Sequence, residues 1–278
     1  MSSFRNLSLF LLFLPTIGIA TPLTLRAAKS PGGPNPWDMP AQFSYLNNSG
    51  GNDSYAINAA VSGNLPNIPN TTAQSQITAW IAKNTLLAKK QDKRGLEAAV
   101  GFAGGDQHFG YIPQLSLSVD QDFVTNSNEA TIEATIDFAS INLNLAGCGK
   151  SFMHGCTYWD FLLGIYSNDV KSSRNNTGIG TINGSKAVLK LTSNPFSSDQ
   201  KLSPLSFSVL AQGQWDSSAS NARVKENRPL YKGTISWRFY KEEDSIKPSI
   251  ALERVVGSDL LAGLDKQAYT QLSFRVAF

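Results

Sequence analysis

The last eight residues of the chain alternate between apolar and mostly polar side chains. In an extended strand, successive side chains point to opposite faces, so residues two apart share a face. The apolar set is Leu272, Phe274, Val276 and Phe278. The other set is Gln271, Ser273, Arg275 and Ala277. This run predicts an amphipathic strand, which could be the edge of a soluble sheet or the closing strand of a membrane barrel.

The same alternation recurs along the chain, whereas helical periodicity is almost absent. Turn-rich segments separate the alternating runs. Together the runs predict about twelve strands, an even number, as in bacterial single-chain barrels. They cover residues 41–47, 55–61, 77–85, 94–103, 111–119, 131–145, 158–166, 186–192, 205–211, 231–240, 248–256 and 271–278. Within 131–145 the apolar residues change phase near Ala139 and Ser140, which a β-bulge would explain.

The N-terminal residues predict export. An apolar run from Leu7 to Ala20 follows Arg5, and Gly18 and Ala20 are small residues at the spacing that a signal peptidase accepts. This pattern predicts a signal peptide over residues 1–20, cleaved after Ala20. No later stretch of about 18 apolar residues occurs, so a helical membrane protein is not expected.

The composition of the two strand faces favours a membrane barrel over a soluble sandwich. A soluble sheet would show water a face rich in Lys and Glu, but here that face carries mostly Ser, Thr, Ala, Gly and Gln, and only 16% of all residues are charged. Aromatic residues fall near strand ends, as in the girdles that flank an apolar band. They are Tyr111, Trp159, Tyr231, Trp237, Tyr269 and Phe278.

With a signal peptide, alternating strands and a terminal Phe278, the chain resembles Gram-negative outer-membrane β-barrel proteins at the level of the class, porin-like and without a narrower family. The resemblance implies an all-β fold, a closed antiparallel transmembrane β-barrel over residues 41–278. Residues 21–40 lack alternation and are expected to form an N-terminal arm or plug segment. The resemblance also implies outer-membrane lipids as surroundings and recognition of the Phe278 strand by the barrel-assembly machinery. The resemblance does not decide whether the protein is a monomer or a homo-oligomer.

Charged residues on the less apolar strand faces are the candidate pore-lining residues. Those from the first half are acidic: Glu97, Asp120, Glu133, Asp137 and Asp160. Those from the second half, apart from Glu253, are basic: Lys186, Lys190, Lys232, Arg238 and Arg275. An acidic wall opposite a basic wall would create a transverse field that orients dipolar solutes. Alternatively, the charges pair across the lumen and hold a small barrel shut.

The sequence therefore predicts a passive channel for small polar solutes. The alternative is a non-conducting barrel with a structural or surface-binding, adhesin-like role. A net charge of +3 is too small to indicate a nucleic-acid partner. His108 and His154 are the two histidines, and no serine motif accompanies His108, so an enzyme is not expected and no cofactor is implied.

Two cysteines, Cys148 and Cys156, predict a disulfide that closes a short loop, as is usual in exported proteins. Zinc would need more ligands than these and His154 supply, so no metal site is expected. Counting strands from the periplasm places this loop on the periplasmic side. The same count places the connections within 167–185, 212–230 and 257–270 on the extracellular side.

Overall fold

The computed structural model describes residues 24–26, 41–47, 54–65, 73–85, 91–102, 104–105, 110–139, 156–172, 178–195, 204–239, 246–259 and 264–277. Within these ranges the secondary structure is strand and turn, and no helix is long and apolar enough to cross a membrane. The strands are β1 (Thr24–Arg26), β2 (Ala41–Asn47), β3 (Ser54–Asn64), β4 (Ala73–Asn84), β5 (Gln91–Phe102), β6 (Gly104–Gly105), β7 (Gly110–Asp122), β8 (Ser127–Ala139), β9 (Cys156–Ser172), β10 (Gly180–Asn194), β11 (Leu205–Ala219), β12 (Leu230–Arg238), β13 (Lys247–Asp259) and β14 (Leu264–Ala277).

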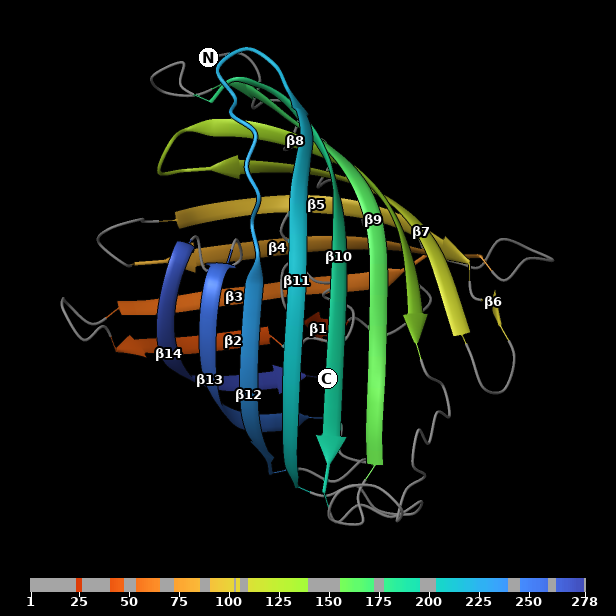
Figure 1. Cartoon of the computed structure of the whole chain (residues 1–278), viewed down its shortest axis with the longest axis vertical. Helices are drawn as coiled ribbons and strands as arrows, with labels where there is room; N and C mark the ends of the chain where they lie inside the picture. The colour runs from red at the N-terminus through yellow and green to blue at the C-terminus, as the bar shows by residue number, and fades with distance from the viewer. Residues whose placement is uncertain are drawn as a thin grey trace.

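Twelve of these strands form a closed antiparallel barrel. Each long strand pairs with the next along the chain, and β14 pairs back to β2. At this seam Phe274 lies opposite Phe43. In Figure 1 the green and blue strands β9–β12 cross in front of the orange strands β2–β4, which belong to the opposite wall. The closed fold and the strand number are therefore confirmed, while Phe278 lies outside the described residues.

Two short strands supplement the barrel. Strand β1 pairs with Ala60–Ser62 of β3, whereas β2 pairs with Ser54–Asn58, so β1 and β2 occupy successive stretches of the same edge of β3. Strand β6 pairs with the first residues of β7. Of the predicted arm or plug over 21–40, Thr24–Arg26 lies in the sheet, and the other residues lie outside the described ranges.

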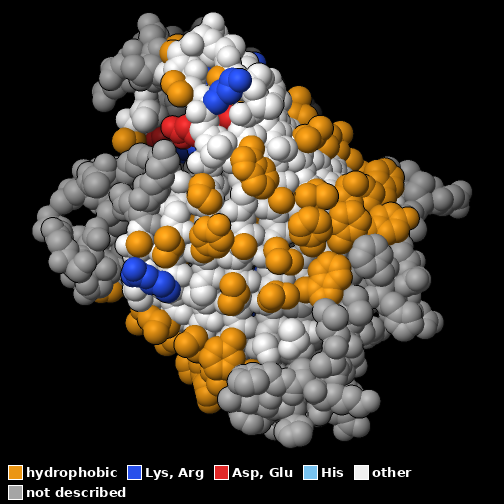
Figure 2. All heavy atoms as spheres, viewed as in Figure 1, with side chains coloured by type: hydrophobic (Ala, Val, Ile, Leu, Met, Phe, Trp, Pro, Cys, Tyr) orange, Lys and Arg blue, Asp and Glu red, His pale blue; other side chains and the backbone are white. Residues whose placement is uncertain are grey.

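The outer face of the barrel is apolar. Large side chains at alternate positions are exposed on strand after strand, and Ile165 reaches 64% exposure. Figure 2 shows apolar side chains spread over this face with few charges among them. Tyr111, Tyr231 and Trp237 lie on it as predicted, but Tyr269 does not. It shares the inner face of β14 with Gln271 and Ser273 and is buried, so its assignment to an aromatic girdle was wrong.

Several strands extend beyond their predicted ends. The segments 167–185 and 212–230 were predicted as connections, but much of each lies in β9, β10 or β11. Their Asn, Asp and Ser residues indicated turns, yet these side chains bond to neighbouring strands. Asn168 donates to Thr131 at 2.8 Å, and Asn183 donates to Ser218 at 2.8 Å. Because neighbouring strands are antiparallel, β9, β11 and β13 end, and β10, β12 and β14 begin, at one end of the barrel, whereas β2 begins and β14 ends at the other.

The connection between β7 and β8 shows how a short turn is encoded. The Asp122 carboxylate accepts hydrogen bonds from the backbone N–H of Val124 at 2.8 Å and of Thr125 at 3.4 Å. Asn126 closes the turn in the left-handed region, with φ of 53°, which Asn tolerates better than most residues. The turn therefore fixes the register of Asp122 against Ser127.

Candidate lumen site

All eleven candidate pore-lining charges lie at inward positions of the barrel strands. Each alternates with exposed apolar residues of the same strand, so the period-two pattern sets their direction. Glu97, Glu133, Lys186 and Glu253 are almost fully buried. What these charges contact decides whether they can act on a solute.

Glu253 is the centre of a polar cluster at the barrel seam. Its Oε2 accepts hydrogen bonds from Gln271 Nε2 at 2.7 Å, Ser273 Oγ at 3.0 Å and Gln42 Nε2 at 3.1 Å. Its Oε1 accepts one from Thr234 Oγ1 at 3.2 Å. Because these partners come from β2, β12 and β14, one carboxylate on β13 joins four consecutive strands, including the first and the last of the barrel.

The same carboxylate is also paired with two cations. Arg275 Nη2 lies 2.6 Å and Lys232 Nζ 3.7 Å from Oε1 of Glu253. Ser44 and Ser273 share a hydrogen bond of 3.0 Å beside it, directly across the β2–β14 pair. Glu253, the one acidic candidate on the predicted basic half of the barrel, is thus the ion-pair partner of Lys232 and Arg275, two basic candidates of that half.

Other acids and bases pair where the two halves of the chain meet. Glu133 on β8 forms an ion pair with Lys186 on β10, and both are buried. Gly164 of the intervening strand β9 lies opposite Lys186, and a Cβ there would come within 3.1 Å of Cε of Lys186. Asp160 and Lys190, opposite each other on β9 and β10, lie 3.9 Å apart. Arg238 donates to Asn194.

These contacts join strands that are one or two positions apart, so they run along the wall of the barrel. Directly opposite residues on paired strands have Cβ atoms about 5 Å apart, within reach of an ion pair. The pairs therefore neutralise charge locally and reduce the transverse field that two oppositely charged walls would create.

Inward polar groups at one end of the barrel escaped the sequence prediction. Arg228 binds Asp216 with N–O distances of 3.1 and 3.2 Å, and the hydroxyl of Tyr166 donates to the same carboxylate. Both Asp216 and Arg228 fall in the segment predicted as the connection 212–230. The backbone of Gln214 and Arg228 exchanges two hydrogen bonds, which continues the β11–β12 ladder into that segment. The alternation of β11 continues through Gln214 to Asp216, and this pattern could have shown that the strand extends into the segment.

A second missed cluster lies on β5, β7 and β8. Lys93 Nζ is 2.8 Å from Glu129 Oε1, and the register places Asp120 opposite both Gly95 and Glu129. Asp120 is buried, and its Oδ1 has no hydrogen-bond partner. Lys93 and Glu129 were missed because each lies just outside the predicted strands 94–103 and 131–145.

The lumen also has an apolar side. Six buried side chains on six consecutive strands pack into one cluster, with Ala56 of β3 against it. They are Leu162, Val188, Leu210, Leu230, Val255 and Tyr269. The inner face of β9–β14 is therefore apolar at this level, which the predicted charged wall did not anticipate.

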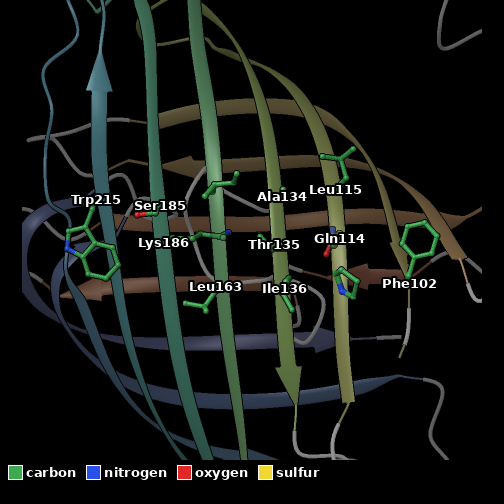
Figure 3. A pocket seen from close by; sticks show the side chains of 13 residues that line it. Phe102, Gln114, Leu115, Ala134, Thr135, Ile136, Leu163, Ser185, Lys186 and Trp215 are labelled. Carbon is green, nitrogen blue, oxygen red and sulfur yellow. The ribbon is translucent and has the colours of Figure 1, made fainter. Parts of the chain in front are cut away.

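One groove of about 630 Å³ lies on the wall formed by β5 and β7–β11. Figure 3 shows Phe102 and Trp215 at its two ends, with Leu115, Ile136 and Leu163 between them. These side chains belong to the outer face, so lipid is the medium that meets this groove. Among the described residues, no group of three or more His, Cys, Asp and Glu side chains could hold a metal ion.

A closed twelve-stranded antiparallel barrel with an apolar outer face and a largely polar inner face is the architecture of outer-membrane β-barrels. The chain is a protein of this class. Its closure leaves every barrel strand paired on both sides, as the hydrocarbon of a bilayer requires.

No protein-family model and no curated protein matches the chain. Among solved structures, it is similar to one described as a NanC porin, with 10% identity, a TM-score of 0.46, and coverage of 86% of this chain and 98% of that chain. It is also similar to the translocator domain of the autotransporter NalP from Neisseria meningitidis, with 12% identity, a TM-score of 0.41, and coverage of 99% and 96%. The fold assignment here depends on the strand pairing itself.

Proposed function

We propose that the protein is a narrow outer-membrane channel for small polar solutes. The observation that carries the proposal is a row of inward polar residues that crosses six neighbouring strands in register. The row consists of Ser62, Thr78, Glu97, Ser118, Thr131 and Asn168. Within the row, Ser62 bonds to Thr78 and Asn168 bonds to Thr131. A wall lined by hydroxyl, amide and carboxylate groups favours polar solutes over apolar ones.

A second candidate is a non-conducting barrel with a structural or surface-binding role. The apolar cluster that contains Leu162 and Val255 favours it, because a layer of packed apolar side chains narrows the lumen. Polar solutes pass such a layer only at the cost of losing their hydration. The two candidates therefore differ in whether the polar row remains open to water beside the apolar cluster.

Planar-bilayer conductance of the refolded full chain tests the channel. We expect small stepwise currents in the wild type and larger ones in Leu162→Ala, which removes part of the apolar cluster. Ile165→Ala is the matched control, because Ile165 lies on the outer face of the same strand. A flat trace for both the wild type and Leu162→Ala would overturn the channel and leave the non-conducting barrel.

The proposal includes export by residues 1–20 with cleavage after Ala20, assembly through the C-terminal strand, and a Cys148–Cys156 disulfide. Cys148 and Phe278 lie outside the described residues, as do His108 and His154. The lipid-facing wall suits either a monomer or a homo-oligomer, and a channel of this kind would need no cofactor and have no catalytic activity. Mass spectrometry of the mature protein under non-reducing conditions checks the cleavage site and the disulfide.

A further inference from the structure

We propose that the inner wall formed by β4, β5, β7 and β8 contains a subsite for a small organic cation, such as a quaternary ammonium group, formed by the Trp80 ring together with the carboxylates of Asp120 and Glu129. The inference names a class of solute for the proposed channel. Only the use of the subsite in transport rests on the proposed function. Binding can be measured whether or not the barrel conducts.

The first argument is a surplus of negative charge. Asp120, Asp122 and Glu129 lie on the inner faces of β7 and β8, and the register brings Lys93 opposite Asp122. Arg223 approaches the same region, where its Nη2 lies 3.0 Å from Asn168 Oδ1. Three acidic side chains therefore face two basic ones in this part of the wall.

The second argument is that one of these carboxylates has a buried oxygen without a hydrogen bond. Glu129 has Lys93, and Oδ1 of Asp122 accepts the backbone N–H groups of the β7–β8 turn. Asp120 is only 8% exposed, and its Oδ1 has no hydrogen-bond partner. A buried carboxylate oxygen without a hydrogen bond is unfavourable, and a cation bound beside it reduces that cost.

The third argument is an aromatic ring at the same level of the wall. Trp80 on β4 lies opposite Gly95 on β5, and Gly95 lies opposite Asp120 on β7. A Cβ on Gly95 would be 2.7 Å from both the Trp80 ring and the carbonyl oxygen of Val119. The ring therefore lies over Gly95, beside the strand that carries Asp120.

Trp80 is itself an unusual lumen residue. Its side chain is 7% exposed, and its Nε1 has no hydrogen-bond partner. Trp159, Trp215 and Trp237 alternate with inward residues on their strands and thus belong to the outer face. An indole ring beside carboxylates is the combination that binds quaternary ammonium groups, through the negative face of the ring and the opposite charge.

The chemistry favours an organic cation over a metal ion. No three described carboxylates are placed to share a metal ion, which needs several oxygen ligands. A large, weakly hydrated cation instead gains from one aromatic surface and one or two nearby carboxylates.

The test is a calorimetric titration of the detergent-refolded full chain with choline chloride. The comparison compound is 3,3-dimethylbutan-1-ol, which has the shape of choline without its charge. We expect saturable binding of choline and none of the alcohol. Asp120→Asn and Trp80→Leu should each weaken choline binding by about tenfold. Asp169→Asn, a carboxylate change on the outer face of β9, should leave it unchanged.

Heat-modifiable gel mobility shows that each variant is folded, and Trp80→Phe, which keeps an aromatic face, should retain most of the binding. Equal binding of choline and the alcohol, or equal affinity in the wild type and Asp120→Asn, would overturn the subsite. A barrel that conducts without binding choline overturns only this inference, whereas one that binds choline without conducting overturns only the channel.

Discussion

Glu253→Gln should destabilise the barrel more than Asp160→Asn, because Glu253 is fully buried and bonds to side chains on three neighbouring strands. The carboxylate accepts four side-chain hydrogen bonds and pairs with Arg275 and Lys232. Glutamine keeps the shape of the side chain but replaces one acceptor oxygen with an NH₂ donor. Whichever oxygen is replaced, the new donor faces donors, and both cations lose their counter-charge.

The size of the effect follows from burial. Glu253 is fully buried, and Arg275 and Lys232 are only 17% and 15% exposed. Breaking a buried ion pair by removing one partner costs about 3–5 kcal/mol. We therefore expect the free energy of unfolding to fall by about that amount, since the network also joins the first and last strands. Urea titration in phospholipid vesicles, with tryptophan fluorescence and gel mobility as the readouts, measures this free energy of unfolding.

Asp160→Asn is the matched control. Its ion pair with Lys190 has an N–O distance of 3.9 Å, and both side chains are about one-third exposed. Exposed pairs of this kind contribute about 0–1 kcal/mol. If Glu253→Gln lost no more stability than Asp160→Asn, the seam network would not hold the barrel closed, and the reasoning from burial would be refuted.

Two further changes test the packing of the wall. Gly95→Ala should lower the free energy of unfolding by about 1–3 kcal/mol, because its Cβ would meet the Trp80 ring and a backbone oxygen. Gly233→Ala is the control: no atom lies within 4 Å of its Cβ, so the same urea titration should show no change. Ile235→Arg places a charge on the outer face of β12 and should cost about 2–4 kcal/mol if it lies near the bilayer midplane. Val224→Arg, in the connection before β12, should cost little, and equal effects of the two arginines on folding into vesicles would argue against a lipid-facing wall.

The outer face was the predictable part of the fold. Lipid requires apolar side chains there, so residues such as Leu115, Ile165 and Leu252 repeat with a period of two whatever the lumen contains. The strand number followed from that period and from the turn-rich segments between the runs, and the pairing of β14 with β2 followed from the closed barrel that the resemblance implies. Strand ends were less predictable, because Asn168 and Asp216 have side chains typical of turns but bond to neighbouring inward groups instead.

The inner face was predictable in direction but not in contacts. Alternation indicates that Glu133 and Lys186 point inward, but not that they pair across the intervening strand, where Gly164 leaves room for the Lys186 side chain. The apolar cluster was missed for a similar reason. Leu162, Val188 and Leu210 each occupy a single inward position among polar neighbours, and only the register of three strands shows that they adjoin.

The arrangement of the paired charges bears on what the lumen can still do. Inward residues reach their neighbours on adjacent strands, so acids and bases pair along the wall wherever the two halves of the chain meet. Glu133 and Asp160 are paired in this way at the β8–β10 boundary, and Glu253 is paired at the seam side. The boundaries between the acidic and basic walls are thus locally neutralised. Asp120, whose Oδ1 has no hydrogen-bond partner, lies away from these boundaries. If the cation subsite proposed here exists, electrostatic selection in the lumen acts on cations at this part of the wall.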